Sequence, residues 1–159
     1  MNAMIPERGG AAVGHLQDYD SLKATAVIYL RMWCDGPDMQ SIVQHDMTQA
    51  LGAARGQRVF EAFCDLCRLC AHHGRRPLAH HALHCKCVGA DEASFAQFIA
   101  SATEGDREDA MLIAILLVRP DVAPVITSLA TQFGISLKQM KLCARRAAAP
   151  KPTGRHRLH

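Results

Sequence analysis

Cysteine and histidine residues gather in one short window of the chain. Between Cys64 and Cys87 lie five of the seven cysteines and five of the nine histidines. Thiolate sulfur and imidazole nitrogen are the ligands that zinc prefers, usually four of them in a tetrahedral arrangement. A loop that follows a helix can bring four such groups together with little strain. The window therefore predicts a zinc site.

The loop after the helix offers the best candidate ligands. Cys85 and Cys87 flank Lys86 outside any apolar periodicity, so an extended chain can direct both sulfurs to one ion, and the lysine favours the thiolate form. His81 lies four residues before Cys85, and His73 ends the preceding helix. The predicted ligand set is His73, His81, Cys85 and Cys87, with Cys70 and His80 as substitutes.

The other cysteines of the window have a plainer explanation. Cys64, Cys67 and Cys70 recur every three residues on the apolar side of a predicted helix, where free cysteine often packs as a small hydrophobe. His73 can likewise serve only to complement a helix dipole. A catalytic zinc would need an open position beside a carboxylate, and neither a His-Glu-x-x-His nor a deaminase motif is present. We therefore predict a structural metal and no enzyme.

Helical periodicity runs through most of the chain on both sides of the window. Apolar residues make up 49% of the sequence and aromatic residues only 5%, which favours packed helices. Asp20, Asp91 and Asp106 are suitable N-caps. The sequence predicts an all-α, single-domain bundle of about six or seven helices with a Cys/His-rich metal-binding loop. The expected parts are a flexible leader (1–17), a helical domain (18–148) with the metal-binding loop at 70–88, and a basic flexible tail (149–159).

The C-terminal segment 123–147 resembles a DNA-binding helix-turn-helix. Gly134 breaks the apolar pattern, and Ser136 followed by Gln139 matches the capping box that begins a helix. Residues 121–159 contain seven Lys or Arg against one Asp, a net charge of +6 that suits a polynucleotide partner. A helix-glycine-helix connection also occurs in ordinary bundles, and a basic end can simply be solvated. The candidate nucleic-acid-binding residues are Ser136, Lys138, Gln139, Lys141, Arg145 and Arg146.

The stretch from His73 to Glu92 resembles a family of uncharacterised helical proteins of alphaproteobacteria. The resemblance is carried by His73, Arg75, Arg76, Pro77, Leu78, His81, Cys85, Cys87 and the GlyAlaAspGlu run at 89–92. It extends over residues 59–140. The resemblance implies that His73, His81, Cys85 and Cys87 belong together as one set, and it implies no particular activity.

These features favour a zinc-binding helical protein that acts as a DNA-linked transcriptional regulator, a role that suits a homodimer. One alternative is a zinc-stabilised protein-interaction adaptor. Another is a thiol-based redox or metal sensor, in which oxidation of thiolates near Arg75, Arg76 and Lys86 releases the metal. The N-terminus lacks an export signal, and the longest apolar run, 110–118, is too short to cross a bilayer. We therefore expect a cytoplasmic protein with no membrane partner.

Overall fold

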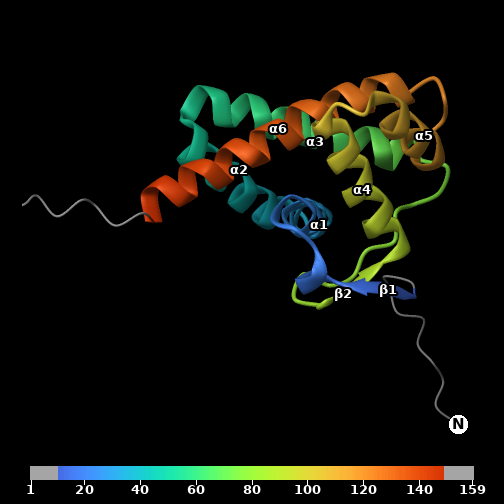
Figure 1. Ribbon diagram of the computed structural model, residues 1–159, viewed down its shortest axis with the longest axis horizontal. Coiled ribbons are helices and arrows are strands. Elements are labelled where there is room, and N and C mark those ends of the chain that lie inside the picture. The colour runs from blue at the N-terminus through green and yellow to red at the C-terminus, as the bar shows by residue number, and fades with distance from the viewer. Residues whose placement is uncertain (1–10, 149–159) are drawn as a thin grey trace, which may run out of the picture.

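The computed structural model describes residues 11–148, which form six α-helices and one small antiparallel sheet (Figure 1). The elements in chain order are β1 (Ala12–His15), η1 (Leu16–Asp18), α1 (Ser21–Cys34), α2 (Pro37–Leu51), α3 (Ala53–His73), β2 (Cys87–Gly89), α4 (Ala90–Glu104), α5 (Arg107–Leu117) and α6 (Ala123–Ala148). The predicted helical bundle is confirmed. In the part of the chain described, no helix is both long and apolar enough to span a membrane.

Local signals set most of the helix boundaries. The Asp20 carboxylate accepts a hydrogen bond of 2.9 Å from the Lys23 N–H, and Asp106 accepts one of 3.2 Å from the Asp109 N–H. Pro37 begins α2 directly after Gly36, whose φ of 107° is accessible to glycine without strain. Asp91 is different, because α4 begins at Ala90 and the carboxylate binds a loop instead of its own helix. The cap predicted at Asp91 is therefore wrong.

Part of the expected flexible leader is ordered. Residues 12–15 form β1, which pairs with β2 in antiparallel register, His15 opposite Cys87 and Ala12 opposite Gly89. The Leu16 N–H continues the ladder by donating to the Lys86 carbonyl at 2.8 Å. The strand has only four residues, too few for an alternating apolar pattern to reveal it. The predicted basic tail at 149–159 lies outside the described residues.

The core lies where α3, α4 and α6 meet. The ring of Phe63 on α3 stacks on that of Phe133 on α6, with centroids 4.7 Å apart and planes 24° from parallel. Phe95 and Phe98 of α4 are fully buried in the same cluster. Aromatic rings bury more apolar surface than any other side chains, so these four rings supply much of the core despite the low aromatic content.

Two glycines mark close contacts between helices. A Cβ on Gly56 of α3 would lie 2.5 Å from the Thr48 Cα and 2.6 Å from the Met47 carbonyl oxygen of α2. A Cβ on Gly134 of α6 would lie 1.7 Å from the Thr103 hydroxyl oxygen of α4. A side chain at either position would force its neighbours to move: backbone atoms of α2 in the case of Gly56, and the Thr103 side chain in the case of Gly134.

The predicted helix-turn-helix is wrong, because α6 is one continuous helix of 26 residues from Ala123 to Ala148. Gly134 lies in its interior, where contact with Thr103, and not a turn, explains the missing side chain. Ser136 does not cap a second helix. Its hydroxyl donates to the Gln132 carbonyl at 2.8 Å, one turn earlier in the same helix, and the residue is buried.

Candidate functional site

The Cys/His-rich loop between α3 and β2 is held by a buried arginine of α1. Arg31 is fully buried, and its guanidinium donates to the carbonyl oxygens of Cys85 at 2.6 Å and Cys87 at 2.7 Å. The same guanidinium pairs with the fully buried Glu92 of α4 at 2.7 Å. Arg31 therefore fixes the loop backbone on one side and binds α4 on the other.

The first turn of α4 supplies two carboxylates that bind the same loop. The second Glu92 oxygen accepts from the His81 N–H at 2.7 Å. Asp91 accepts from the Ala79 N–H at 2.7 Å and from both ends of the Arg76 guanidinium, one of them at 2.8 Å. Hydrogen bonds to charged groups are stronger than neutral ones, so this network gives the irregular loop a defined path.

The four predicted metal ligands are distributed along this loop without forming a cluster. His73 lies at the end of α3, where its Nδ1 is 3.1 Å from the Arg119 Nη2. His81 is buried, and its Nε2 has no hydrogen-bond partner within the described part of the chain. Cys85 and Cys87 are half-buried. Across residues 11–148 no three His, Cys, Asp or Glu side chains lie close enough together to hold a metal ion.

The substitute ligands and the helix cysteines lie mostly inside the protein. Cys64, Cys67 and Cys70 are buried on the inner side of α3, which agrees with their explanation as core residues, while the His80 ring is 3.3 Å from the His81 carbonyl oxygen. Burial raises the pKa of Cys70 to about 12, and burial together with the neighbouring thiols raises that of Cys67. Such thiols stay protonated near neutral pH and react slowly with peroxide. Within the Cys/His-rich window, the sensor alternative therefore depends on Cys85 and Cys87.

Zinc binding stays a prediction, and the metal content of the purified protein tests it. If the predicted set binds zinc, wild-type protein should carry one zinc per chain by elemental analysis, because four ligands satisfy one tetrahedral ion. The variants His81→Ala and Cys85→Ser should lose it. His45→Ala, a change on α2 outside the loop, should retain it. Metal-free wild-type protein, prepared without chelators, would contradict the zinc site.

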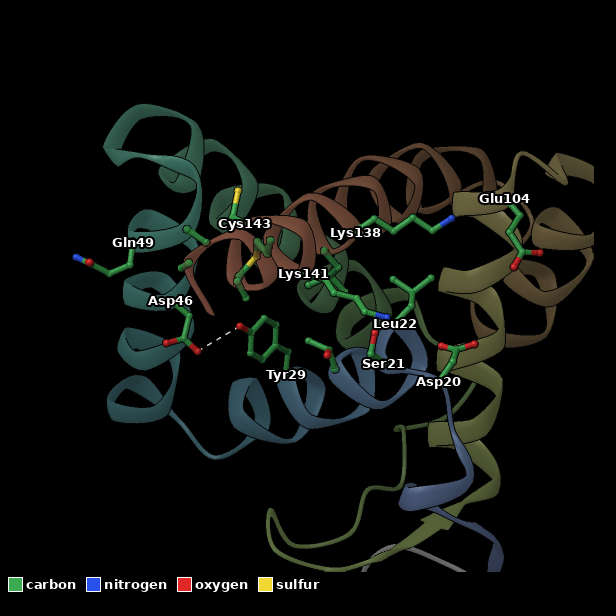
Figure 2. A pocket seen from close by; sticks show the side chains of 16 residues that line it. Asp20, Ser21, Leu22, Tyr29, Asp46, Gln49, Glu104, Lys138, Lys141 and Cys143 are labelled. Carbon is green, nitrogen blue, oxygen red and sulfur yellow. Dashed lines mark hydrogen bonds between the residues drawn. The ribbon is translucent and has the colours of Figure 1, made fainter. Parts of the chain in front are cut away.

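A groove opens between α1, α2 and the second half of α6, away from the Cys/His-rich loop (Figure 2). Its volume is about 730 Å³. The lining residues are Asp20, Ser21, Leu22, Thr25, Tyr29, Asp46, Gln49, Ala50, Glu104, Leu137, Lys138, Met140, Lys141, Cys143, Ala144 and Ala147. We refer to this feature as the α1/α2/α6 groove, and its size is typical of a binding site.

Polar groups stand around the apolar floor of this groove. The Tyr29 hydroxyl donates to the Asp46 carboxylate at 3.2 Å, and burial together with that carboxylate raises the pKa of Tyr29, so the phenol stays protonated. In Figure 2 the Lys141 side chain extends toward Ser21 and Leu22. Lys138 stands on the same helix nearer to Glu104 (Figure 2). Lys141, which was predicted to contact nucleic acid, is exposed and lines the groove.

The remaining residues predicted to bind nucleic acid lie in different environments. Ser136 is buried, and its hydroxyl donates to the Gln132 carbonyl of its own helix. Gln139 is half-buried and accepts a hydrogen bond from Arg55 of α3. Arg145 and Arg146 are exposed near the end of α6. With the turn absent, the support for a DNA-linked role reduces to exposed cations on one helix.

Comparisons of the chain with protein-family models, with curated proteins and with solved structures found no match. The resemblance to alphaproteobacterial proteins therefore stays an expectation.

Proposed function

We propose that the protein is a protein-interaction adaptor that binds an amphipathic helix of a partner protein in the α1/α2/α6 groove. The observation that carries this proposal is the state of the groove's α6 wall. Residues 141–148 are exposed on every side of the helix, although one side of α6 is buried against the body before that point. The groove-facing side of these last two turns has no neighbour among the described residues to cover it.

The shape of the wall favours a helix as the occupant. Ala144 and Ala147 line the groove on successive positions of one helix side, and their small side chains allow another backbone to approach closely. Packed helices lie about 8–10 Å apart, with the shorter distances where the contact residues are small. An amphipathic helix laid into an apolar groove is a common mode of recognition. The floor that it would cover includes Leu22, Leu137 and Met140.

The charges around the groove define the partner further. Lys138 and Lys141 stand on the α6 side, whereas Asp20 and Asp46 stand on the α1 and α2 sides. A complementary helix would carry glutamates along the edge of its apolar stripe that faces α6. Such charges add specificity and accelerate association more than they add affinity.

A synthetic amphipathic helix with a leucine stripe edged by glutamates tests the proposal. We expect Ala144→Trp to weaken its binding at least about tenfold, roughly 1.4 kcal/mol, because the indole fills the groove. Fluorescence anisotropy of the labelled peptide measures the affinity. Leu142→Trp is the matched control, since Leu142 is half exposed on the same turn and does not line the groove.

A second peptide distinguishes specific docking from nonspecific hydrophobic binding. A scrambled peptide of the same composition has no continuous stripe and should bind at least about tenfold more weakly. Equal affinity for both peptides, or an Ala144→Trp variant that binds as well as Leu142→Trp, would reject the α1/α2/α6 groove as the docking site.

A further inference from the structure

A second, smaller cleft lies between the start of α3 and the middle of α6, away from the α1/α2/α6 groove. Its volume is about 270 Å³, and it is lined by Arg55, Arg58, Val59, Gln132, Ile135 and Ser136. We propose that this feature, the arginine cleft, binds a phosphate group. The proposal is independent of the adaptor function and uses none of the groove residues.

Neither arginine of the cleft is paired with a carboxylate, a state that both share with Arg75, Arg107, Arg145 and Arg146 among the described residues. Within the described residues, carboxylates pair with Arg31, Arg68, Arg76 and Arg119, and none pairs with Arg55 or Arg58. Arg55 instead donates to the Gln139 side-chain oxygen of α6. That neutral partner orients the guanidinium at the cleft and leaves its charge uncompensated. An anion is the ligand that completes this arrangement.

The position of Arg55 in its helix supports the same conclusion. It stands in the first turn of α3, a turn that contains no acidic residue, and no side chain caps the helix at Gly52. The N-terminal end of a helix carries partial positive charge, so a cation there is unfavourable. A bound anion would turn this repulsion into attraction. Without a bound anion, Arg55 has no oppositely charged partner among the described residues at this end of α3.

The groups in the cleft suit phosphate better than a carboxylate. Two guanidiniums provide forked N–H donors, and the Gln132 amide stands on the facing helix. A phosphate group offers several strong acceptor oxygens to donors arriving from two sides, and guanidiniums bind it in pairs of hydrogen bonds. Val59 and the half-exposed Ile135 form an apolar edge beside these donors, where the organic part of a phosphate ester fits.

Two sources could supply this phosphate, a small organic phosphate or a polynucleotide backbone. Arg145 and Arg146, exposed further along α6, would add contacts only for the longer ligand. The shared chemistry is the phosphate group itself. The test therefore uses inorganic phosphate and a short DNA duplex as separate probes.

We expect inorganic phosphate to shift the NMR signals of the Arg55 and Arg58 side-chain N–H groups in a saturable way, with chloride at equal ionic strength producing no such shift. Arg55→Gln and Arg58→Gln should each weaken binding at least about fivefold, because each removes one charged donor. Arg68→Gln is the matched control on the same helix, since Arg68 is exposed and already pairs with Asp65. Circular dichroism of each variant confirms that the fold is kept.

The duplex then assigns the source of the phosphate. Binding that is tighter than that of the ion, falls with salt and weakens in Arg55→Gln and in an Arg145→Gln, Arg146→Gln variant supports the cleft as a backbone contact. Phosphate binding without duplex binding supports a small organic phosphate. Absence of saturable phosphate binding, or binding that Arg55→Gln and Arg58→Gln leave as strong as Arg68→Gln does, would overturn the proposal.

Discussion

Replacement of Arg31 by methionine is expected to lower the free energy of unfolding by about 3–5 kcal/mol. The change removes one partner of a fully buried ion pair and leaves the Glu92 carboxylate without its counter-charge in the interior. It also removes the donor that binds the carbonyl oxygens of Cys85 and Cys87. Urea unfolding followed by circular dichroism measures the loss. Because Arg31 binds the loop backbone and also holds Glu92, a second contact of the loop, we expect the Cys/His-rich loop to lose its order first.

An exposed ion pair provides the comparison for this result. Arg68→Met breaks the pair with Asp65, in which both side chains are more than half exposed, and should cost less than about 1 kcal/mol. Arg31→Met that costs no more than Arg68→Met would show that the buried pair has no special role. In the double variant Arg31→Met, Glu92→Leu the unpaired charge is gone, so part of the stability should return.

The free energy of unfolding that the double variant does not regain measures how strongly the network anchors the loop backbone. In the double variant the Cys85 and Cys87 carbonyls still lack Arg31, and the His81 N–H now also lacks Glu92. Each unsatisfied buried group costs about 1–3 kcal/mol unless water reaches it. Full recovery would mean that the network acts only through charge. Incomplete recovery would mean that Arg31 and Glu92 also stabilise the loop through hydrogen bonds to its backbone.

The helices were predictable because residues close in the sequence determine where they begin and end. Asp20 and Asp106 cap helices through N–H groups three positions away, and Pro37 begins α2 beside Gly36. The loop network was not predictable in this way. Arg31 and Glu92 are 61 residues apart, and nothing in a periodic pattern pairs them. The only available signal was a charged residue between Leu30 and Met32, inside an apolar helix, where a buried partner is required.

The Cys/His window likewise shows that contacts between distant residues cannot be predicted from local sequence patterns. Residue types and spacing identified the loop as unusual, but they did not indicate which side chains would meet. The backbone of Cys85 and Cys87, and not the sulfur, makes the contacts with Arg31 that the structure defines. The α1/α2/α6 groove could not be predicted from the sequence for a different reason. A groove is space left beside small residues such as Ala144, and no sequence motif marks it.

Gly134 shows why the C-terminal segment was misinterpreted. A glycine between two apolar helical stretches is compatible both with a turn, where it supplies a positive φ, and with a close helix contact, where it supplies the absence of a side chain. The sequence around it does not distinguish these uses. Thr103, the residue that decides between them, lies on α4 and is far away in the chain.

Gly134→Ala is expected to destabilise the protein by about 1–2 kcal/mol. The new Cβ would lie 1.7 Å from the Thr103 hydroxyl oxygen, which itself donates to the Ile99 carbonyl at 2.6 Å, so Thr103 must rotate or the helices must separate. Overpacking of this kind costs about 1–3 kcal/mol, and the better helix propensity of alanine offsets up to about 1 kcal/mol. Thermal and urea unfolding measure the net effect.

A double-mutant cycle with Thr103 decides between the packing explanation and a turn. Thr103→Ala removes the hydroxyl, leaving a Cβ that would be 3.0 Å from the new one and requires only a small adjustment of α6 against α4. In this background Gly134→Ala should therefore cost at least about 1 kcal/mol less than it does alone. A turn with positive φ at residue 134 would penalise alanine equally in both backgrounds, because the strain would be local. Additive effects in the cycle would thus contradict the close contact between Gly134 and Thr103, whereas strong coupling places Gly134 at the contact between α4 and α6.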